Sequence, residues 1–127
     1  MTTKQNISIL IARLIIGGLF VGTGWMKISD MAMTIGFFQS LGIPAFLAYV
    51  VGYAEFIGGI LLILGLWIEI TTAILAIIMI VAIYLTRAGG FPAFSTPLVT
   101  LGSLLAICAA GPGKIAFSPK KKTAGSM

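Results

Sequence analysis

The sequence contains no histidine and a single cysteine, Cys108. Without histidine, one chain cannot form a bis-histidine haem site, a histidine-based zinc site or a histidine-containing catalytic triad. One cysteine cannot supply a dithiol redox pair. Cys108 lies among small and apolar residues, so we interpret it as a small hydrophobic side chain in a helix. These absences exclude several classes of metal and redox enzyme.

Charge is also scarce. Charged residues make up 9% of the 127 residues and hydrophobic residues 59%. The three acidic residues, Asp30, Glu55 and Glu69, are too far apart in the sequence to suggest a metal-binding cluster. No glycine-rich phosphate-binding motif is present. Because so little polar surface could not cover a soluble globule of this size, the composition predicts an integral membrane protein.

Four apolar stretches have the length of membrane spans, since a bilayer core about 30 Å thick takes roughly 20 helical residues. We expect an all-α, integral membrane four-helix bundle in one domain, residues 1–117, with helices at about 7–26, 45–67, 70–86 and 95–111. The segment 28–44 is too short to cross. Ile35, Phe38 and Leu41 recur there at three-residue spacing, which favours a short interfacial helix between the first and second spans. A loop packed on the bundle is the alternative.

The basic residues predict the orientation. Four spans place both termini on one side of the membrane, where five lysines gather: Lys4, Lys114, Lys120, Lys121 and Lys122. Lys27 and Arg87 fall on the other side. The excess of lysine predicts that both termini are cytoplasmic. We expect residues 118–127 to form a basic, disordered tail that contacts anionic lipid rather than nucleic acid, because no basic surface continues from it.

Glu55 is one carboxylate inside an otherwise uncharged apolar run, residues 31–68. Burying an ionisable side chain at mid-membrane costs at least about 2.5 kcal/mol, so a partner is expected. Counted at about 1.5 Å per residue, Arg13 and Glu55 differ in depth by about one helical turn. We therefore predict an Arg13–Glu55 ion pair between antiparallel neighbours. Small residues on the same helix faces should pack around it: Gly17, Gly24, Gly52 and Gly59.

Such a pair has two interpretations, which the sequence leaves open. It can be a latch that fixes the register of two helices, or it can line a cavity for the polar head of a lipophilic molecule such as a quinone. A proton or ion path is a third possibility. Lys27, Tyr84 and Arg87 lie near helix ends, where interfacial anchoring is the first expectation and ligand contact the second.

Two further small-residue motifs occur in the first and fourth predicted spans: Gly18-x-x-x-Gly22 and Gly102-x-x-x-Ala106-x-x-x-Ala110. Such motifs let helices approach closely. We expect both to serve packing within the bundle, with a dimer interface as the alternative.

An ordered set of residues runs through residues 7–111: Arg13, Gly24-Trp25-Met26-Lys27, Phe38 with the Gly42-Ile43-Pro44 turn, Glu55-Phe56-Ile57-Gly58-Gly59 and Leu64-Gly65-Leu66. In this set the chain resembles the DoxX family of small four-helix membrane proteins. The resemblance implies a multi-pass protein of the bacterial or archaeal inner membrane, with family-motif positions at Arg13, Lys27, Glu55, Gly58 and Gly59. Some relatives accompany quinol oxidase or thiosulfate:quinone oxidoreductase activity, and many have no known activity.

The chain departs from the family pattern at two places. Many relatives have a basic residue where this chain has Ile68-Glu69, and many have a histidine near the end of the third helix, where Tyr84 and Thr86 stand here. If that histidine serves proton or quinone chemistry in relatives, this protein uses Tyr84 in its place or lacks that chemistry.

The first functional hypothesis is a membrane component of an oxidoreductase system that binds quinone near Arg13 and Glu55. Arg13 would donate to a carbonyl oxygen, Glu55 would hold Arg13 or relay a proton, and electrons would come from a redox protein partner, because the chain has no intrinsic cofactor ligands. The second hypothesis is a non-enzymatic scaffold, assembly or homeostasis factor. The third is a small transporter, which would need homo-oligomerisation to enclose a path.

Overall fold

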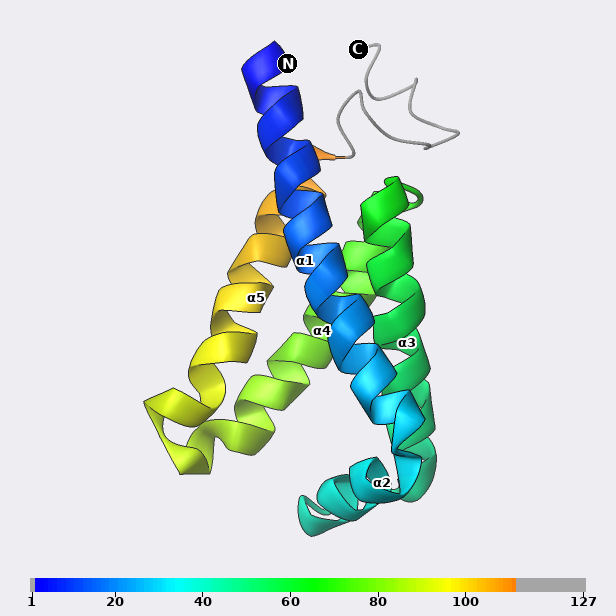
Figure 1. Ribbon diagram of the computed structural model, residues 1–127. Coiled ribbons are helices and arrows are strands. Elements are labelled where there is room, and N and C mark those ends of the chain that lie inside the picture. The colour runs from blue at the N-terminus through cyan, green and yellow to red at the C-terminus, as the bar shows by residue number, and fades with distance from the viewer. Residues whose placement is uncertain (1, 112–127) are drawn as a thin grey trace.

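The computed structural model describes residues 2–111, and the regular structure in that range is helical (Figure 1). The helices are α1 (Thr3–Ser29), α2 (Met31–Ser40), α3 (Ala45–Leu64), α4 (Ile68–Thr86) and α5 (Phe91–Ala110), with a 3-10 turn, η1 (Arg87–Gly89), between the last two. All but α2 are long and apolar enough to span a membrane. The predicted all-α architecture, with a short helix between the first two spans, is confirmed. The end of the predicted membrane domain and the basic tail, residues 112–127, lie outside the described residues.

Local capping explains why the first two spans differ from their predicted bounds. α1 begins at Thr3 rather than residue 7 because Thr2 and Gln5 form a capping box, in which each side chain accepts a hydrogen bond from the other's backbone N–H. α3 ends at Leu64 rather than residue 67 because Gly65 takes a left-handed conformation with φ 79°. The Gly65 N–H then bonds to the carbonyl of Leu61, which closes the helix.

The last two spans begin earlier than predicted. α4 starts at Ile68 instead of residue 70, directly after Trp67, a non-glycine residue with φ 46°. α5 starts at Phe91 instead of residue 95, because Pro92 falls in its first turn, where proline needs no hydrogen-bond donor. Pro97 therefore lies inside α5.

The spanning helices form two pairs, α1 with α3 and α4 with α5 (Figure 1). The start of α1 and the end of α5 lie at one end of the bundle, called here the terminal end; the opposite end, which carries α2, is called the α2 end. Toward the α2 end the two pairs separate, as Figure 1 shows. The apolar core lies between the pairs and consists of Phe20, Leu62, Ile68, Leu75, Ala76, Met79, Leu104 and Ile107.

Glycines let α1 and α3 cross with their backbones in contact. A Cβ atom added to Gly17 would lie 2.7 Å from the carbonyl oxygen of Gly59, and one added to Gly24 would lie 2.5 Å from the backbone nitrogen of Phe56. Gly58 faces α4, where a Cβ would lie 3.0 Å from Leu75 Cδ1. The lack of side chains thus fixes where the two helices meet.

The other small-residue motifs do not pack within the described part of the chain. Gly18, Gly22 and Gly102 have nothing within 4 Å of the position a Cβ would take, and Ala106 is exposed. The prediction that both motifs serve packing within the bundle is therefore wrong. The physical reason is that one residue turns a helix by about 100°, so the contact between α1 and α3 that uses Gly17 points Gly18 away from it.

Candidate functional site

Glu55 lies in the bundle interior with 3% of its surface exposed. Its Oε1 atom accepts two hydrogen bonds from α1: one from Lys27 Nζ at 2.9 Å and one from Thr23 Oγ1 at 3.0 Å. Thr23 and Lys27 are four residues apart, so they occupy the same face of α1, one turn from each other. The carboxylate is therefore held by an ammonium and a hydroxyl that come from a single neighbouring helix.

Lys27 is thus a partner of Glu55. The sequence placed it just beyond a helix ending at residue 26, whereas α1 continues to Ser29 and includes it. The Lys27 side chain keeps 28% of its surface exposed, against 4% for that of Glu55. The ion pair consequently joins a buried acid to a base at the edge of the interior.

Arg13 does not meet Glu55, so the predicted Arg13–Glu55 ion pair is wrong. Its Nη2 atom donates to the carbonyl oxygen of Ile63 at 3.2 Å, and the residue is 1% exposed. Ile63 lies eight residues after Glu55, about 12 Å further along α3. The depth estimate failed because the register of α1 against α3 is fixed by the contact between Gly17 and Gly59. Arg13 instead binds a carbonyl in the last turn of α3, where the helix dipole favours a cation.

Tyr84, the fourth predicted ligand contact, is not brought to this cluster. It is 61% exposed on α4, and the Arg87 guanidinium carbon lies 3.8 Å from the centre of its ring. Arg87 also donates from Nη1 to the Tyr84 carbonyl oxygen. This part of α4 has separated from α1 and α3 (Figure 1), so Tyr84 and Arg87 form their own cation–π pair at the surface.

The second carboxylate oxygen of Glu55 is available. Among residues 2–111, both hydrogen bonds to Glu55 end on Oε1, and Oε2 accepts none. Lys27 Nζ has three N–H groups and donates one of them within the same range. The cluster therefore offers one acceptor and further donors at adjacent positions, which suits a group that carries both a hydroxyl and an oxygen acceptor.

Thr23 and Thr34 are site residues that the sequence interpretation missed. The Thr34 hydroxyl, on α2, donates to the carbonyl oxygens of Lys27 and Asp30, each at 3.1 Å. The Asp30 side chain accepts from the Met33 backbone N–H and so caps α2. The corner between α1 and α2 is thereby tied to Lys27. The spacing of Thr23 four residues before Lys27 was the one available signal for Thr23, and nothing in the sequence links Thr34 to this site.

Of the glycines expected to pack around the ion pair, only some lie beside it. Gly52 lies beside it, because a Cβ on Gly52 would contact Lys27 Cβ at 3.4 Å. Gly17 and Gly59 form the helix crossing nearer the terminal end, and Gly58 packs on α4. The glycines therefore act mainly to bring α1, α3 and α4 together, and through that contact to position Lys27 against Glu55.

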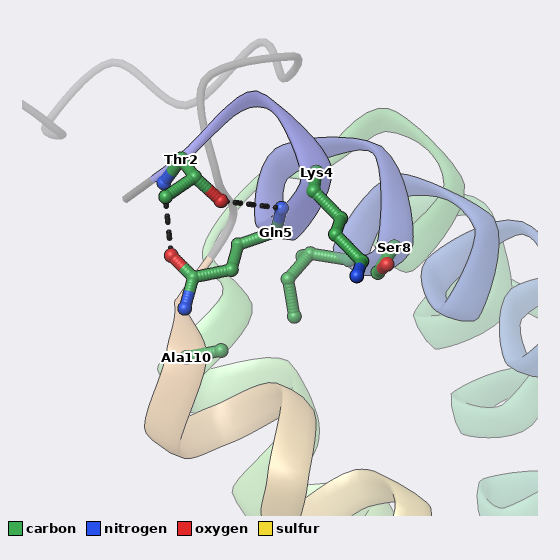
Figure 2. A pocket seen from close by; sticks show the side chains of 6 residues that line it. Thr2, Lys4, Gln5, Ser8 and Ala110 are labelled. Carbon is green, nitrogen blue, oxygen red and sulfur yellow. Dashed lines mark hydrogen bonds between the residues drawn. The ribbon is translucent and has the colours of Figure 1, made fainter.

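Two hollows in the described structure lie away from the ion pair itself. One of about 680 Å³ is open and lies at the terminal end (Figure 2), lined by Thr2, Lys4, Gln5, Ser8, Ile9 and Ala110. The hydroxyl of Thr2 and the amide oxygen of Gln5 are engaged in the capping box shown there. The other, of about 320 Å³, is a groove between α1 and α5 lined by Ile16, Leu19, Ser95, Thr96, Val99 and Thr100.

Comparison with known proteins shows which family the sequence is similar to. The sequence model of the DoxX family matches residues 8–88. A protein of Bacillus subtilis (strain 168) named "Putative oxidoreductase CatD" is 40% identical over 83 residues, which cover 65% of this chain and 62% of that protein. "Inner membrane protein YqjF" of Escherichia coli (strain K12) is 28% identical over 118 residues, or 89% of this chain and 91% of that protein. There is no significant match among solved structures.

Proposed function

The chain belongs to the DoxX family of membrane proteins, and we propose that it is the membrane component of an oxidoreductase system, binding a quinone or a similar lipophilic molecule beside Lys27 and Glu55. The observation that carries the proposal is the carboxylate of Glu55, a buried acid that is held on one oxygen and open on the other. Oε2 accepts no hydrogen bond from residues 2–111 and is not fully enclosed by protein atoms, so a ligand hydroxyl can reach it. The name of the B. subtilis relative supports the oxidoreductase class.

Each residue of the cluster has a role in this proposal. Lys27 donates to an oxygen of the ligand head group. Glu55 relays a proton to a quinone oxygen as the partner's electrons reduce it, and Oε2 then accepts a hydrogen bond from the hydroxyl so formed. Thr23 and Lys27 both donate to Glu55 Oε1, which leaves Oε2 for the ligand. Electrons come from a redox protein partner, because a chain with no histidine and one cysteine offers few ligands for a redox centre of its own.

Arg13 has a different role from the one that the sequence suggested. It lies about 21 Å from Lys27 along α1 and binds the end of α3, so in this proposal it positions the two helices and does not touch the ligand. The sequence left a helix latch and a ligand contact as alternatives for the Arg13–Glu55 pair. In this proposal Arg13 is the latch, and the Lys27–Glu55 pair contacts the ligand.

Binding of a short-chain hydroquinone to the protein in lipid nanodiscs tests the proposal. We expect Glu55→Gln and Lys27→Met to weaken binding about tenfold or more, the loss expected for a charge-assisted hydrogen bond. Glu69→Gln is the matched control, since Glu69 is an exposed acid in the first turn of α4. Equal binding by the wild type and Glu55→Gln, or binding by neither, would remove the proposed site.

A scaffold or assembly role is the second candidate, and the close glycine crossing of α1 and α3 favours it. In that case the ion pair serves folding alone. The double substitution of Lys27 and Glu55 by methionine would then keep folding and partner association, because a buried pair is often replaceable by apolar residues of similar size. Under the quinone proposal the same variant folds and loses binding.

The orientation belongs to the proposal as well: both termini face the cytoplasm and α2 lies at the outer surface of the inner membrane. A Cys108→Ala background with one new cysteine, at Gln39 or at Thr3, tests it. A membrane-impermeant maleimide added to intact cells that express the protein should label the cysteine at Gln39 and spare the one at Thr3. The reverse labelling pattern would contradict the orientation.

A further inference from the structure

The groove between α1 and α5 uses the same face of α1 as Thr23 and Lys27. Ile16 and Leu19 form its α1 wall, and they precede Thr23 and Lys27 at spacings of three, four and four residues. Residues so spaced lie along one face of a helix. Leu19 is about 6 Å along the helix axis from Thr23 and about 12 Å from Lys27. The groove and the ion pair are therefore two parts of one stripe on α1.

The lining of the groove is effectively apolar although half of it consists of hydroxyl residues. On the α5 wall, Thr100 Oγ1 donates to the Thr96 carbonyl at 2.8 Å and Ser95 Oγ donates to the Pro92 carbonyl at 3.5 Å. Those two hydroxyls are directed to their own helix. Ile16, Leu19 and Val99 supply hydrocarbon. The groove therefore suits a hydrocarbon chain better than a polar head group.

The size and position of the groove favour a chain over a helix of a second copy. It extends along α5 from Ser95 to Thr100, about 8 Å of helix axis, and along one turn of α1. A helix with its side chains is about 10 Å across and needs a longer contact. The groove lies between α1 and α5, which belong to different helix pairs, and the two pairs separate toward the α2 end (Figure 1).

We propose that this groove holds the proximal isoprenoid chain of a quinol whose hydroxyl-bearing head group lies at Lys27 and Glu55. This inference rests on the proposed function and adds the position of the chain and the redox form of the ligand. The head must supply a hydrogen-bond donor to Glu55 Oε2, which the reduced form has and the oxidised form lacks. The ligand enters sideways from the bilayer between α1 and α5.

The test compares hydroquinones with no chain, one isoprenoid unit and two units, in nanodiscs, for variants that fill the groove. Leu19→Trp and Val99→Trp fill it from opposite walls; Leu14→Trp and Leu105→Trp are matched controls, because these leucines are exposed and outside the groove. Partitioning into lipid rises with chain length equally for every variant, so variants are compared at each length.

We expect Leu19→Trp and Val99→Trp to bind the two-unit quinol about tenfold more weakly than wild type, through lost packing contacts, and to bind the chainless quinol normally. Normal chainless binding also shows that these variants fold. The oxidised, chainless quinone should bind wild type more weakly than the quinol, and Glu55→Gln should remove that difference.

The outcomes separate the two proposals. If the chainless quinol binds through Glu55 but both Trp variants leave two-unit binding unchanged, the groove inference is overturned and the proposed function stands. If the chainless quinol does not bind, or binds regardless of Glu55→Gln, the proposed function fails with it. If the Trp variants change the oligomeric state in light scattering, the groove is an interface between copies and does not hold a chain.

Discussion

Gly17 of α1 and Gly59 of α3 meet backbone to backbone, so that a Cβ on either would lie 2.7 Å or 2.6 Å from the carbonyl oxygen of the other. The obstacle at that distance is backbone, which cannot move aside as a flexible side chain can. The crossing fixes the register of the two helices, and the register in turn decides which side chain of α1 reaches Glu55.

We therefore predict that Gly59→Ala or Gly17→Ala lowers the free energy of unfolding by about 1 to 3 kcal/mol, the usual cost of overpacking. Gly18→Ala is the control one residue away. It has open space around the added methyl and should leave the protein unchanged or slightly more stable, because alanine is the better helix former. Unfolding in mixed micelles of increasing SDS content measures both. Equal effects at Gly17 and Gly18 would contradict the crossing.

The Lys27–Glu55 pair should behave as a coupled unit. Lys27→Met leaves Glu55 buried without its cation and should cost about 3 kcal/mol, whereas the double methionine variant should lie within about 1 kcal/mol of wild type. A double-mutant cycle of unfolding free energies measures the coupling, which these two values put at about 2 kcal/mol or more. Strict additivity at this pair would mean that the two side chains do not interact in the membrane.

Arg13 should instead act independently of Glu55. Arg13→Met leaves the part-buried Ile63 carbonyl, in the last turn of α3, without its donor and should cost about 1 to 3 kcal/mol. Because Arg13 and Glu55 share no partner among the described residues, the cycle of Arg13→Met with Glu55→Gln should be additive within about 0.5 kcal/mol. Strong coupling there would restore the ion pair that the sequence had suggested.

The turn between α3 and α4 depends on the left-handed conformation of Gly65, with φ 79°. Gly65→Ala should destabilise the protein by about 1 to 2 kcal/mol, because a Cβ is strained in that conformation. Gly36→Ala is the comparison, since Gly36 lies within α2 with open space around it and should gain up to about 1 kcal/mol of helix propensity. Thermal unfolding in detergent compares the two. A loss at Gly36 as large as that at Gly65 would show that backbone conformation is not the cause.

Much of the architecture could be predicted because it depends on local properties along the chain and not on contacts between distant segments. The length of each apolar run determines the number of spans, and Gly42, Pro44 and Pro92 mark where helices stop or start. The short helix α2 followed from a segment that is apolar and too short to cross. The errors at helix ends were of one to four residues, and they arose where a capping box or a glycine turn decided the boundary.

The sequence by itself determined that this is a four-span membrane protein with a buried acid that needs a cation, because hydrophobic length and the cost of burying charge are properties of a segment alone. Only the tertiary structure decided that the cation is Lys27 and that Arg13 holds the end of α3. The reason is geometric. Sliding one antiparallel helix along another by a few residues changes which side chains meet. Neighbouring residues of one helix also point in different directions, so Gly17 faces α3 and Gly18 faces away from it.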